Sequence, residues 1–379
     1  MSSDRHLLVL NERDPLHPRA GGAELHVERI CQRLVERGHQ ITWHSTSFRG
    51  SKARETISGI SIERRGPLPL YYAGLPARIR SQIAAGGFDL VLECLNKVPF
   101  YAPLYAGVPV LALCHHLFGR VAFEQVAWPI ALGVVASESA IPLVYRNCPF
   151  VAISQSTAED LRRRGIASER IRVSPPGVDR PALSVDPDSP RPSRLTYVGR
   201  LERYKRVDLL LRVGARLIQE YPDLELSVLG QGPERSRLEA LANELGISAR
   251  TRFYGFVPDA DRDALLAQSR LCLFPSEKEG WGLTVIEANA LGTPVVARDA
   301  PGLRDSIRDG ETGWLVQTAP SHGEEVERWL KVVTRAFSED DRAREIRRNC
   351  LGWSKRFDWE RATDELERAV EWSIKGEPT

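Results

Sequence analysis

The sequence predicts an α/β protein built from two domains, each with a parallel β-sheet covered by helices. Short β-type runs alternate with longer segments of helical period along the whole chain, which is the pattern of βαβ units. The alternation stops once, over residues 182–193, and then restarts. The chain has 379 residues, of which 42% are hydrophobic. Because domains usually contain roughly 100–200 residues, two domains are the expected number.

The first half of the chain contains six apolar runs of strand length and one well-marked amphipathic helix. The helix is predicted over residues 23–39, where Gly38 favours its end and one stripe carries Leu25, Ile30, Leu34 and Val35. The predicted strands span residues 6–10, 40–44, 90–94, 109–113, 150–154 and 171–175. Residues 1–181 therefore form the first predicted domain.

A segment rich in Pro, Ser and Asp, residues 182–193, follows this domain and has no sustained period, which is typical of a linker. The second domain, residues 194–357, is predicted to contain strands at residues 194–199, 224–230, 252–256, 271–275, 294–298 and 313–317. The last segment, 358–379, is helical by pattern and apolar on one side, so it must pack on another part of the chain. Ligands of such sheets bind beyond the carboxyl ends of the strands, so two domains offer a cleft between facing sheet edges.

Composition disfavours several classes of function. The net charge is +2 and no zinc-finger, helix-turn-helix or aromatic-basic RNA signature is present, so no nucleic-acid partner is expected. The longest apolar runs, such as 107–114, are far shorter than the ~20 residues that span a bilayer, and the first residues lack a signal-peptide pattern. We therefore expect a cytoplasmic protein. The six cysteines form no C-x-x-C pair, which disfavours a zinc site or disulfides and indicates buried thiols.

The stretch SEKEGWGLTVIEANALGTPVVA, residues 276–297, is the strongest candidate site. It places Glu279 and Glu287 around a turn in which Gly280 and Gly282 permit close approach of the backbone, and a helix follows the turn. The amino terminus of a helix presents unpaired N–H groups and suits a phosphate or diphosphate. Glu287 can accept hydrogen bonds from vicinal hydroxyls, and Glu279 would lie nearer the reacting end of the ligand. Two glutamates on a turn are usually solvated charges, but the flanking glycines and strands favour a ligand site.

A second candidate site follows the predicted strand 194–199. In YVGRLERYKRVD, Arg200 comes directly after the strand and Lys205 about one turn later, so a guanidinium and an ammonium group can converge on one anion. The alternative is a basic helix start in water, which the preceding YVGR disfavours. A weak G-x-G, at Gly230 and Gly232, lacks the third glycine of a dinucleotide fingerprint.

These motifs resemble those of the retaining family 4 glycosyltransferases, whose GT-B fold consists of two Rossmann-like domains. Residues 276–297 are similar to the E-x7-E motif of the family, YVGRLERYKRVDLLL to its G-R-l-x-x-x-K motif, and SPPGVD (174–179) to its P-x-G-V-D pattern. In the first half, GGAE matches a glycine pair after the first strand, here Gly21 and Gly22. The run LALCHH matches a strand that ends in a histidine, here His115, with His116 as the alternative. The resemblance covers nearly the whole chain.

The resemblance implies an acceptor-binding first domain, a second domain that binds a nucleotide sugar, and a last helix, 358–379, that crosses back to the first domain. It implies retaining transfer of a hexose-type sugar from a UDP- or GDP-sugar to a hydroxyl acceptor, such as a sugar or a lipid-linked group, in polysaccharide, glycolipid or glycoconjugate synthesis. Charge on the leaving diphosphate would be stabilised by side chains and a helix terminus, so neither a metal nor a cofactor is expected.

The site residues follow from the same resemblance. The implied catalytic residues are His115, Arg200, Lys205 and Glu279. The implied donor-binding residues are Gly21, Gly22, Gly230, Gly232, Gly280, Trp281, Gly282, Leu283, Thr284 and Glu287. His115 would approach the donor sugar, whereas the alternative is an ordinary packed histidine at a strand end.

The sequence departs from the family pattern in places. Trp281 stands where the family often has Phe, Arg206 where it often has a second Gly, and His116 where Asp is common; Glu24 is typical of a subset only. Three other functions stay open: a GT-B sugar-nucleotide epimerase, a phosphorylase-like enzyme, which lacks a pyridoxal lysine context here, and a non-catalytic sugar-nucleotide-binding subunit.

The segment 115–147 is unusually apolar and aromatic, and two interpretations of it stay open. One is packing in the core of the first domain. The other is a pair of helices facing the acceptor or a membrane, with Phe118, Phe123 and Trp128 as anchors, which would place the protein on the inner face of the membrane.

Overall fold

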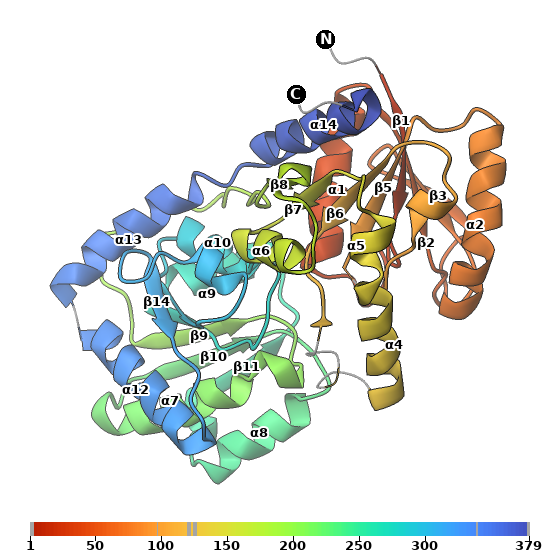
Figure 1. The fold of residues 1–379 in the computed structure, drawn as a ribbon. Helices are drawn as coiled ribbons and strands as arrows, with labels where there is room; N and C mark the ends of the chain where they lie inside the picture. Colours follow the sequence, from red (N-terminus) through yellow and green to blue (C-terminus); the bar gives the residue numbers. More distant parts are fainter. Residues whose placement is uncertain (1–3, 97, 120–122, 124–126, 339, 377–379) are drawn as a thin grey trace. The chain divides into compact units, whose positions relative to one another are not determined.

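The chain forms two compact units, each built around one β-sheet (Figure 1). The computed structural model describes residues 4–96, 98–119, 123, 127–338 and 340–376. The first unit combines Met1–Gly177 with Asp358–Thr379, and the second unit comprises Val178–Phe357. The last helix of the chain therefore belongs to the first unit, as the family resemblance implies.

The first unit contains an eight-stranded sheet in the order β3-β4-β2-β1-β5-β6-β7-β8. Every neighbouring pair is parallel except β3 with β4. The strand order reverses between β1 and β5, which is the position where parallel sheets of this kind bind ligands. The strands are β1 (His6–Leu10), β2 (Gln40–Ser45), β3 (Arg54–Ile57), β4 (Ile60–Arg64), β5 (Leu90–Leu95), β6 (Val110–Cys114), β7 (Phe150–Ala152) and β8 (Ile171–Val173).

The hairpin of β3 and β4 is absent from the strands that the sequence predicts. Its register pairs Ile57 with Ile60, so the turn consists of Ser58 and Gly59 alone. Both turn residues have positive φ, 49° and 79°, which is typical of the tight turns that join antiparallel strands. The Ser-Gly pair between two alternating runs was the signal that could have revealed this hairpin.

Helices cover both faces of the first sheet, because alternate strand residues point to opposite sides. Leu8, Leu10 and Val91 point to one side and share a core with α2, α5 and α6. The other side carries α1 and α14, which contact each other (Figure 1). The helices of this unit are α1 (Gly22–Glu36), α2 (Leu68–Ala84), α4 (Trp128–Ser139), α5 (Ile141–Val144), α6 (Gln155–Arg163) and α14 (Trp359–Lys375), with 3-10 turns at Ala102–Leu104 and Ser168–Arg170.

The second unit contains a six-stranded sheet in the order β11-β10-β9-β12-β13-β14, with every pair parallel. The order reverses between β9 and β12, which is the arrangement of a doubly wound nucleotide-binding sheet. The strands are β9 (Arg194–Val198), β10 (Glu225–Leu229), β11 (Thr251–Gly255), β12 (Leu271–Phe274), β13 (Val295–Arg298) and β14 (Gly313–Val316). All six lie where the sequence predicts them.

Two helical layers enclose this sheet. Leu271 and Leu273 point into the larger core, which includes α7, α8 and α12. Cys272 and Phe274 point into a second core with α9, α10 and α11. The helices are α7 (Val207–Glu220), α8 (Arg235–Glu244), α9 (Asp259–Ala267), α10 (Leu283–Ala290), α11 (Leu303–Ser306), α12 (His322–Ser338) and α13 (Asp340–Ser354), with 3-10 turns at Arg203–Lys205 and Ser248–Arg250.

The segment 182–193 contains no helix or strand and packs on the second unit. Arg191 donates hydrogen bonds to the backbone oxygens of Ser269 and Leu291, at 2.8 Å each. Arg347 donates to the carbonyl oxygen of Ser189 at 2.9 Å. The second half of the segment is thus held to the second unit.

Two further features bear on the expectations from composition. The six cysteines are all buried and free. Among the described helices, none is both long enough and apolar enough to cross a membrane.

Candidate functional site

The main candidate site of the second unit lies where its strand order reverses. The loop after β9 carries Lys205, the loop after β12 carries Glu279, and the two side chains form an ion pair. The backbone joins the same loops, because the N–H of Glu277 donates to the oxygen of Tyr204 at 3.0 Å. Lys205 is only 8% exposed, and its ammonium lies 5.3 Å from the centre of the Phe274 ring. The structure therefore brings together two residues that lie far apart in the sequence.

Arg200 and Arg206 flank this pair and differ in their surroundings. Arg200 is exposed and lies two residues after the end of β9. Arg206 has φ 51°, a left-handed conformation that costs roughly 1–2 kcal/mol outside glycine, which explains why glycine suits this position. Ion pairs with Asp208 (3.2 Å), Glu277 (3.3 Å) and Glu325 (3.1 Å) hold Arg206 in place. Arg206 thus fastens the Lys205 loop to the loop of Glu279.

The turn before α10 is shaped by glycines and one large aromatic side chain. Gly282 has φ 90° and precedes Leu283 and Thr284, which form the first turn of α10. Trp281 is buried, and its ring packs edge-on against Phe357 at 5.1 Å. A Cβ at Gly302 would lie 2.5 Å from the carbonyl oxygen of Glu279, so only glycine lets the neighbouring loop support this turn. Gly302 therefore packs directly against the turn that connects Glu279 to α10.

Glu287 lies inside α10 and is half-buried. Burial raises the pKa of its carboxyl group, and Arg262 on α9 opposes this rise from 3.8 Å away. A carboxylate in such a position accepts hydrogen bonds readily, as the predicted contact with vicinal hydroxyls requires.

The predicted donor-binding glycines fall into two groups. A Cβ at Gly230 would lie 1.9 Å from the oxygen of Gly199, and one at Gly232 would lie 2.3 Å from the oxygen of Leu201. The packing of two neighbouring loops therefore already requires these two glycines. Gly21 differs, because a Cβ there would meet only Glu24, at 3.9 Å. The packing of the chain itself does not require glycine at position 21.

Gly21 caps α1 at the carboxyl edge of the first sheet, where the strand order reverses between the paired strands β1 and β5. Its N–H donates to Oε2 of Glu24 at 2.8 Å, and Glu24 is buried. This interaction explains Glu24: it holds the first turn of the helix. Gly22 is the first residue of the helix.

His115 follows β6 directly and is buried, at 2% exposure. Its Nε2 lies 3.1 Å from Nδ1 of His26 on α1, and burial lowers its pKa to about 4. Its backbone is fixed by hydrogen bonds with the oxygen of Leu95 (3.1 Å) and the hydroxyl of Thr157 (3.2 Å). His116 is less buried and lies against the ring of Phe118.

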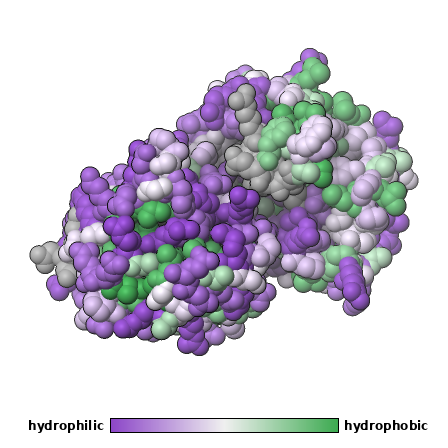
Figure 2. Space-filling view, turned by 90° about the horizontal axis from the view of Figure 1, so that it is seen from below, coloured by the Kyte–Doolittle hydropathy of each residue, from purple (hydrophilic) through white to green (hydrophobic). Residues whose placement is uncertain are grey.

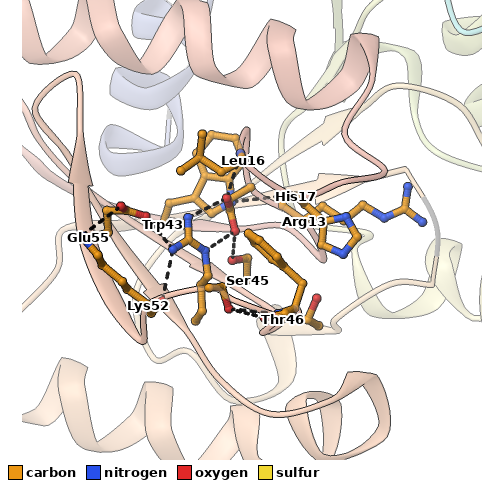
Figure 3. Close-up of polar contacts among 12 residues, drawn as sticks. Arg13, Leu16, His17, Trp43, Ser45, Thr46, Lys52 and Glu55 are labelled. Atoms are coloured by element: carbon orange, nitrogen blue, oxygen red, sulfur yellow. Dashed lines mark hydrogen bonds and ion pairs between the residues drawn. The ribbon is translucent and has the colours of Figure 1, made fainter. Parts of the chain in front are cut away.

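A buried ion pair anchors the long loop between β1 and α1 (Figure 3). Asp14 and Arg64 have no exposed side-chain surface, and two nitrogens of Arg64 donate to the two oxygens of Asp14 at 2.7 and 2.9 Å. Ser45 and the backbone N–H of Leu16 also donate to Asp14, at 2.7 and 3.0 Å. Arg64 also donates to Glu55 at 2.8 Å. The pair holds the middle of the loop that leads to Gly21.

Sequence reasoning missed one exposed aromatic residue, Phe256, at the candidate site of the second unit. Phe256 is 79% exposed and follows Gly255, whose oxygen accepts a hydrogen bond from the N–H of Gly230 at 2.7 Å. It therefore lies at the carboxyl edge of the second sheet, near the predicted Gly230 loop. The signal was present in the strand ending RFYGF, which places an aromatic residue just beyond a strand.

In the described part of the chain, no group of three or more His, Cys, Asp or Glu residues could hold a metal ion.

Two family models match the chain. The model described as Glycosyltransferase Family 4 matches residues 20–180, and the model described as Glycosyl transferases group 1 matches residues 184–349. D-inositol 3-phosphate glycosyltransferase of Rhodococcus jostii (strain RHA1) is 36% identical over 390 residues, which cover 92% of this chain and 83% of the relative. The protein of the same name from Nocardia farcinica (strain IFM 10152) is 32% identical over 388 residues, 92% of this chain and 84% of the relative.

Solved structures agree on the fold. Sucrose-phosphate synthase from Thermosynechococcus elongatus superposes with a TM-score of 0.79 at 21% identity, covering 98% of this chain and all of that one. Anabaena HepE, solved in complex with UDP-glucose, superposes with a TM-score of 0.73 at 19% identity, also over 98% of this chain and all of that one. The chain therefore belongs to the family 4 glycosyltransferases and has their GT-B fold.

Proposed function

We propose that this glycosyltransferase moves a hexose-type sugar from a UDP- or GDP-sugar to a hydroxyl acceptor with retention at the anomeric carbon. The observation that carries the proposal is the ion pair of Lys205 and Glu279 at the point where the strand order of the second sheet reverses. This is where doubly wound sheets bind nucleotides. A cation for the diphosphate and a carboxylate for the sugar lie side by side there.

The costly step is departure of the nucleoside diphosphate from a sugar that gains positive charge. Catalysis then depends on groups that stabilise the leaving diphosphate. The ammonium of Lys205 has three donors, so it can keep Glu279 and also bind a phosphate oxygen. Arg200 is exposed on the same loop between β9 and α7, and the first turn of α10 presents backbone N–H groups, as helix amino termini do. These groups support a reaction that needs no metal ion and no cofactor.

Recognition of the nucleoside is proposed to use Glu287 and Phe256. The half-buried carboxylate of Glu287 would accept hydrogen bonds from the ribose hydroxyls. The exposed ring of Phe256 offers a flat apolar surface on which a base can stack.

The acceptor is proposed to bind the first unit. The relatives from Rhodococcus and Nocardia are named for D-inositol 3-phosphate, so phosphorylated polyols are the first acceptors to test.

Lipid-linked acceptors are the second class to test, because the apolar helix α4 exposes large hydrophobic side chains. Trp128, Ile130 and Leu132 are 70%, 60% and 54% exposed, and Figure 2 shows hydrophobic surface on the first unit. We propose that α4 lies against a membrane surface on its cytoplasmic side. The described part of the apolar segment excludes residues 120–122 and 124–126.

The donor is tested with UDP-, GDP- and ADP-sugars in the presence of EDTA, starting with UDP-glucose, which Anabaena HepE binds. The assay measures release of nucleoside diphosphate without acceptor by wild type, Glu279→Ala and a control, Glu311→Ala. Glu311 is an exposed carboxylate of the same unit that pairs only with the surface residue Arg308 among the contacts described. We expect slow release from one donor, loss of release in Glu279→Ala and no change in Glu311→Ala.

Other outcomes would contradict the proposal. If EDTA abolished the release and Mg²⁺ restored it, metal independence would be wrong. Conversion of the nucleotide sugar into an epimer, with no diphosphate released, would identify an epimerase instead.

Membrane contact is tested by co-sedimentation with anionic vesicles, where Trp128→Ser is expected to reduce binding of the protein to the vesicles. Wild-type protein that stays in solution would refute the membrane contact.

A further inference from the structure

Two buried histidines of the first unit form a pair whose outer nitrogens are unsatisfied. His26 on α1 and His115 after β6 are 1% and 2% exposed, and Nδ1 of His26 lies 3.1 Å from Nε2 of His115. The other two nitrogens, Nε2 of His26 and Nδ1 of His115, are buried and have no hydrogen-bond partner among the described residues. Buried polar atoms are normally paired, so each exception requires an explanation.

The pair shares a fixed number of protons. Burial lowers the pKa of both rings, so both are neutral and each carries one N–H. One N–H occupies the hydrogen bond between the rings, and the other N–H is therefore on an outer nitrogen. If His26 donates, the outer proton is on Nδ1 of His115. If His115 donates, the outer proton is on Nε2 of His26.

The surroundings fix His26 more firmly than a lone hydrogen bond would. Its ring stacks on Trp359 of α14, with 5.9 Å between ring centres and 29° between ring planes. A Cβ at Gly177 would lie 2.4 Å from the backbone nitrogen of Trp359, so the backbone packs closely behind the tryptophan. His26 is thus held between α1 and α14, and it can impose its own orientation on the ring of His115.

We propose that His26 is a positioning residue for His115. It donates from Nδ1 to Nε2 of His115, which fixes the ring of His115 and keeps its proton on Nδ1. That N–H is then a donor at the carboxyl edge of the first sheet, the edge at which ligands of such sheets bind. The inference rests on the proposed function and on the contact of His115 with the donor sugar that the family resemblance implies. His26 itself touches no substrate.

The binding test separates the sugar from the nucleotide. His26→Phe keeps the aromatic ring against Trp359 but removes the nitrogen that faces His115, whereas His26→Asn restores a polar atom near Nδ1. His6→Phe is the matched control, because it removes a hydrogen bond to Thr42 (3.0 Å) elsewhere in the same unit. We expect His26→Phe to weaken binding of the nucleotide sugar about 5-fold or more and to leave binding of the nucleoside diphosphate unchanged. His26→Asn should recover part of the loss, and His6→Phe should change neither affinity.

Nitrogen NMR of the histidine rings provides a readout independent of activity. In the wild type we expect His115 to be protonated on Nδ1 and unprotonated on Nε2, and we expect both resonances to shift in His26→Phe but not in His6→Phe. A proton on Nε2 of His115, or equal losses of affinity for sugar nucleotide and nucleotide, would overturn the inference. A wild type that shows the expected tautomers but binds no nucleotide sugar would instead refute the proposed function.

Discussion

Removal of Arg64 should destabilise the first unit more than removal of any comparable surface arginine. In Arg64→Met, the carboxylate of Asp14 stays fully buried and keeps only the donors of Ser45 and Leu16. Breaking one side of a buried ion pair costs about 3–5 kcal/mol. For a unit of about 200 residues this lowers the melting temperature by roughly 6–20 °C. Scanning calorimetry measures the shift directly, and urea titration gives the free energy of unfolding.

Two further variants make the argument refutable. Arg216→Met breaks an exposed pair with Glu327, at 3.0 Å, and should cost less than about 1 kcal/mol. The double variant Asp14→Leu/Arg64→Met leaves no fully buried charge unpaired, since Glu55, the other partner of Arg64, is partly exposed, and it should recover at least half of the lost stability. A loss below about 1 kcal/mol in Arg64→Met, or a double variant as unstable as the sum of its parts, would refute the reasoning.

The same pair predicts a pH dependence. Burial raises the pKa of Asp14, but hydrogen bonds from Arg64 and Ser45 outweigh it and hold the pKa below its usual value. A carboxyl group whose pKa is lower in the folded state stabilises the protein above its unfolded pKa of about 3.9 and loses that effect as the pH falls further. The difference in stability between wild type and Arg64→Met should therefore shrink below pH ~4.

Three other changes test the loops and the last helix. Gly302→Ala should push the Glu279 turn away, since a Cβ there would lie 2.5 Å from the carbonyl oxygen of Glu279. Diphosphate release should then fall at least 10-fold, while the other surfaces of the protein stay unaltered. Phe256→Ala should raise the KM for the nucleotide sugar roughly 5- to 100-fold with little change in kcat, because one base stack is lost; an unchanged KM would contradict the proposed base contact. Arg37 forms ion pairs with Glu360 and Glu367 of α14 at 2.8 and 2.7 Å, and the pKa of each carboxyl group is lowered in the folded protein. Arg37→Ala should therefore reduce the free energy of unfolding at pH 7, and this reduction should disappear below pH ~4, where both carboxyl groups are protonated. Urea titrations at both pH values would show it, and an equal loss at pH 7 and pH 3 would argue against this account.

The sequence predicts most of the fold, because its strands are short apolar runs bounded by turn residues. All six strands of the second sheet and six of the eight in the first lie where the pattern places them. The missed hairpin contains Arg54, Glu55 and Arg64, charged residues that hide the alternation. These charges pair with residues elsewhere in the first unit, as Arg64 does with Asp14 and Glu55. A local sequence pattern does not indicate such partners.

The candidate site divides in the same way. Motif spacing locates Lys205 and Glu279 separately, and only the parallel pairing of β9 with β12 places their loops side by side. His26 could not be found from spacing, because its link to His115 joins a helix to a strand end far along the chain. The role of Gly230 could not be predicted either. A glycine that lets the backbone approach a ligand and one that lets it approach another part of the backbone have the same appearance in the sequence.

The discontinuity of the first unit has a consequence for synthesis. Its final helix, Trp359–Lys375, is made only after the whole second unit, Val178–Phe357. At ~5–20 residues per second, the ribosome needs roughly ten to forty seconds to make those intervening residues. Throughout that interval α1 lacks the partner against which His26 stacks, so its apolar side stays open to water or to a chaperone. A nascent chain arrested before residue 358 should therefore bind chaperones and be cut by protease in the first unit, although that unit was made first.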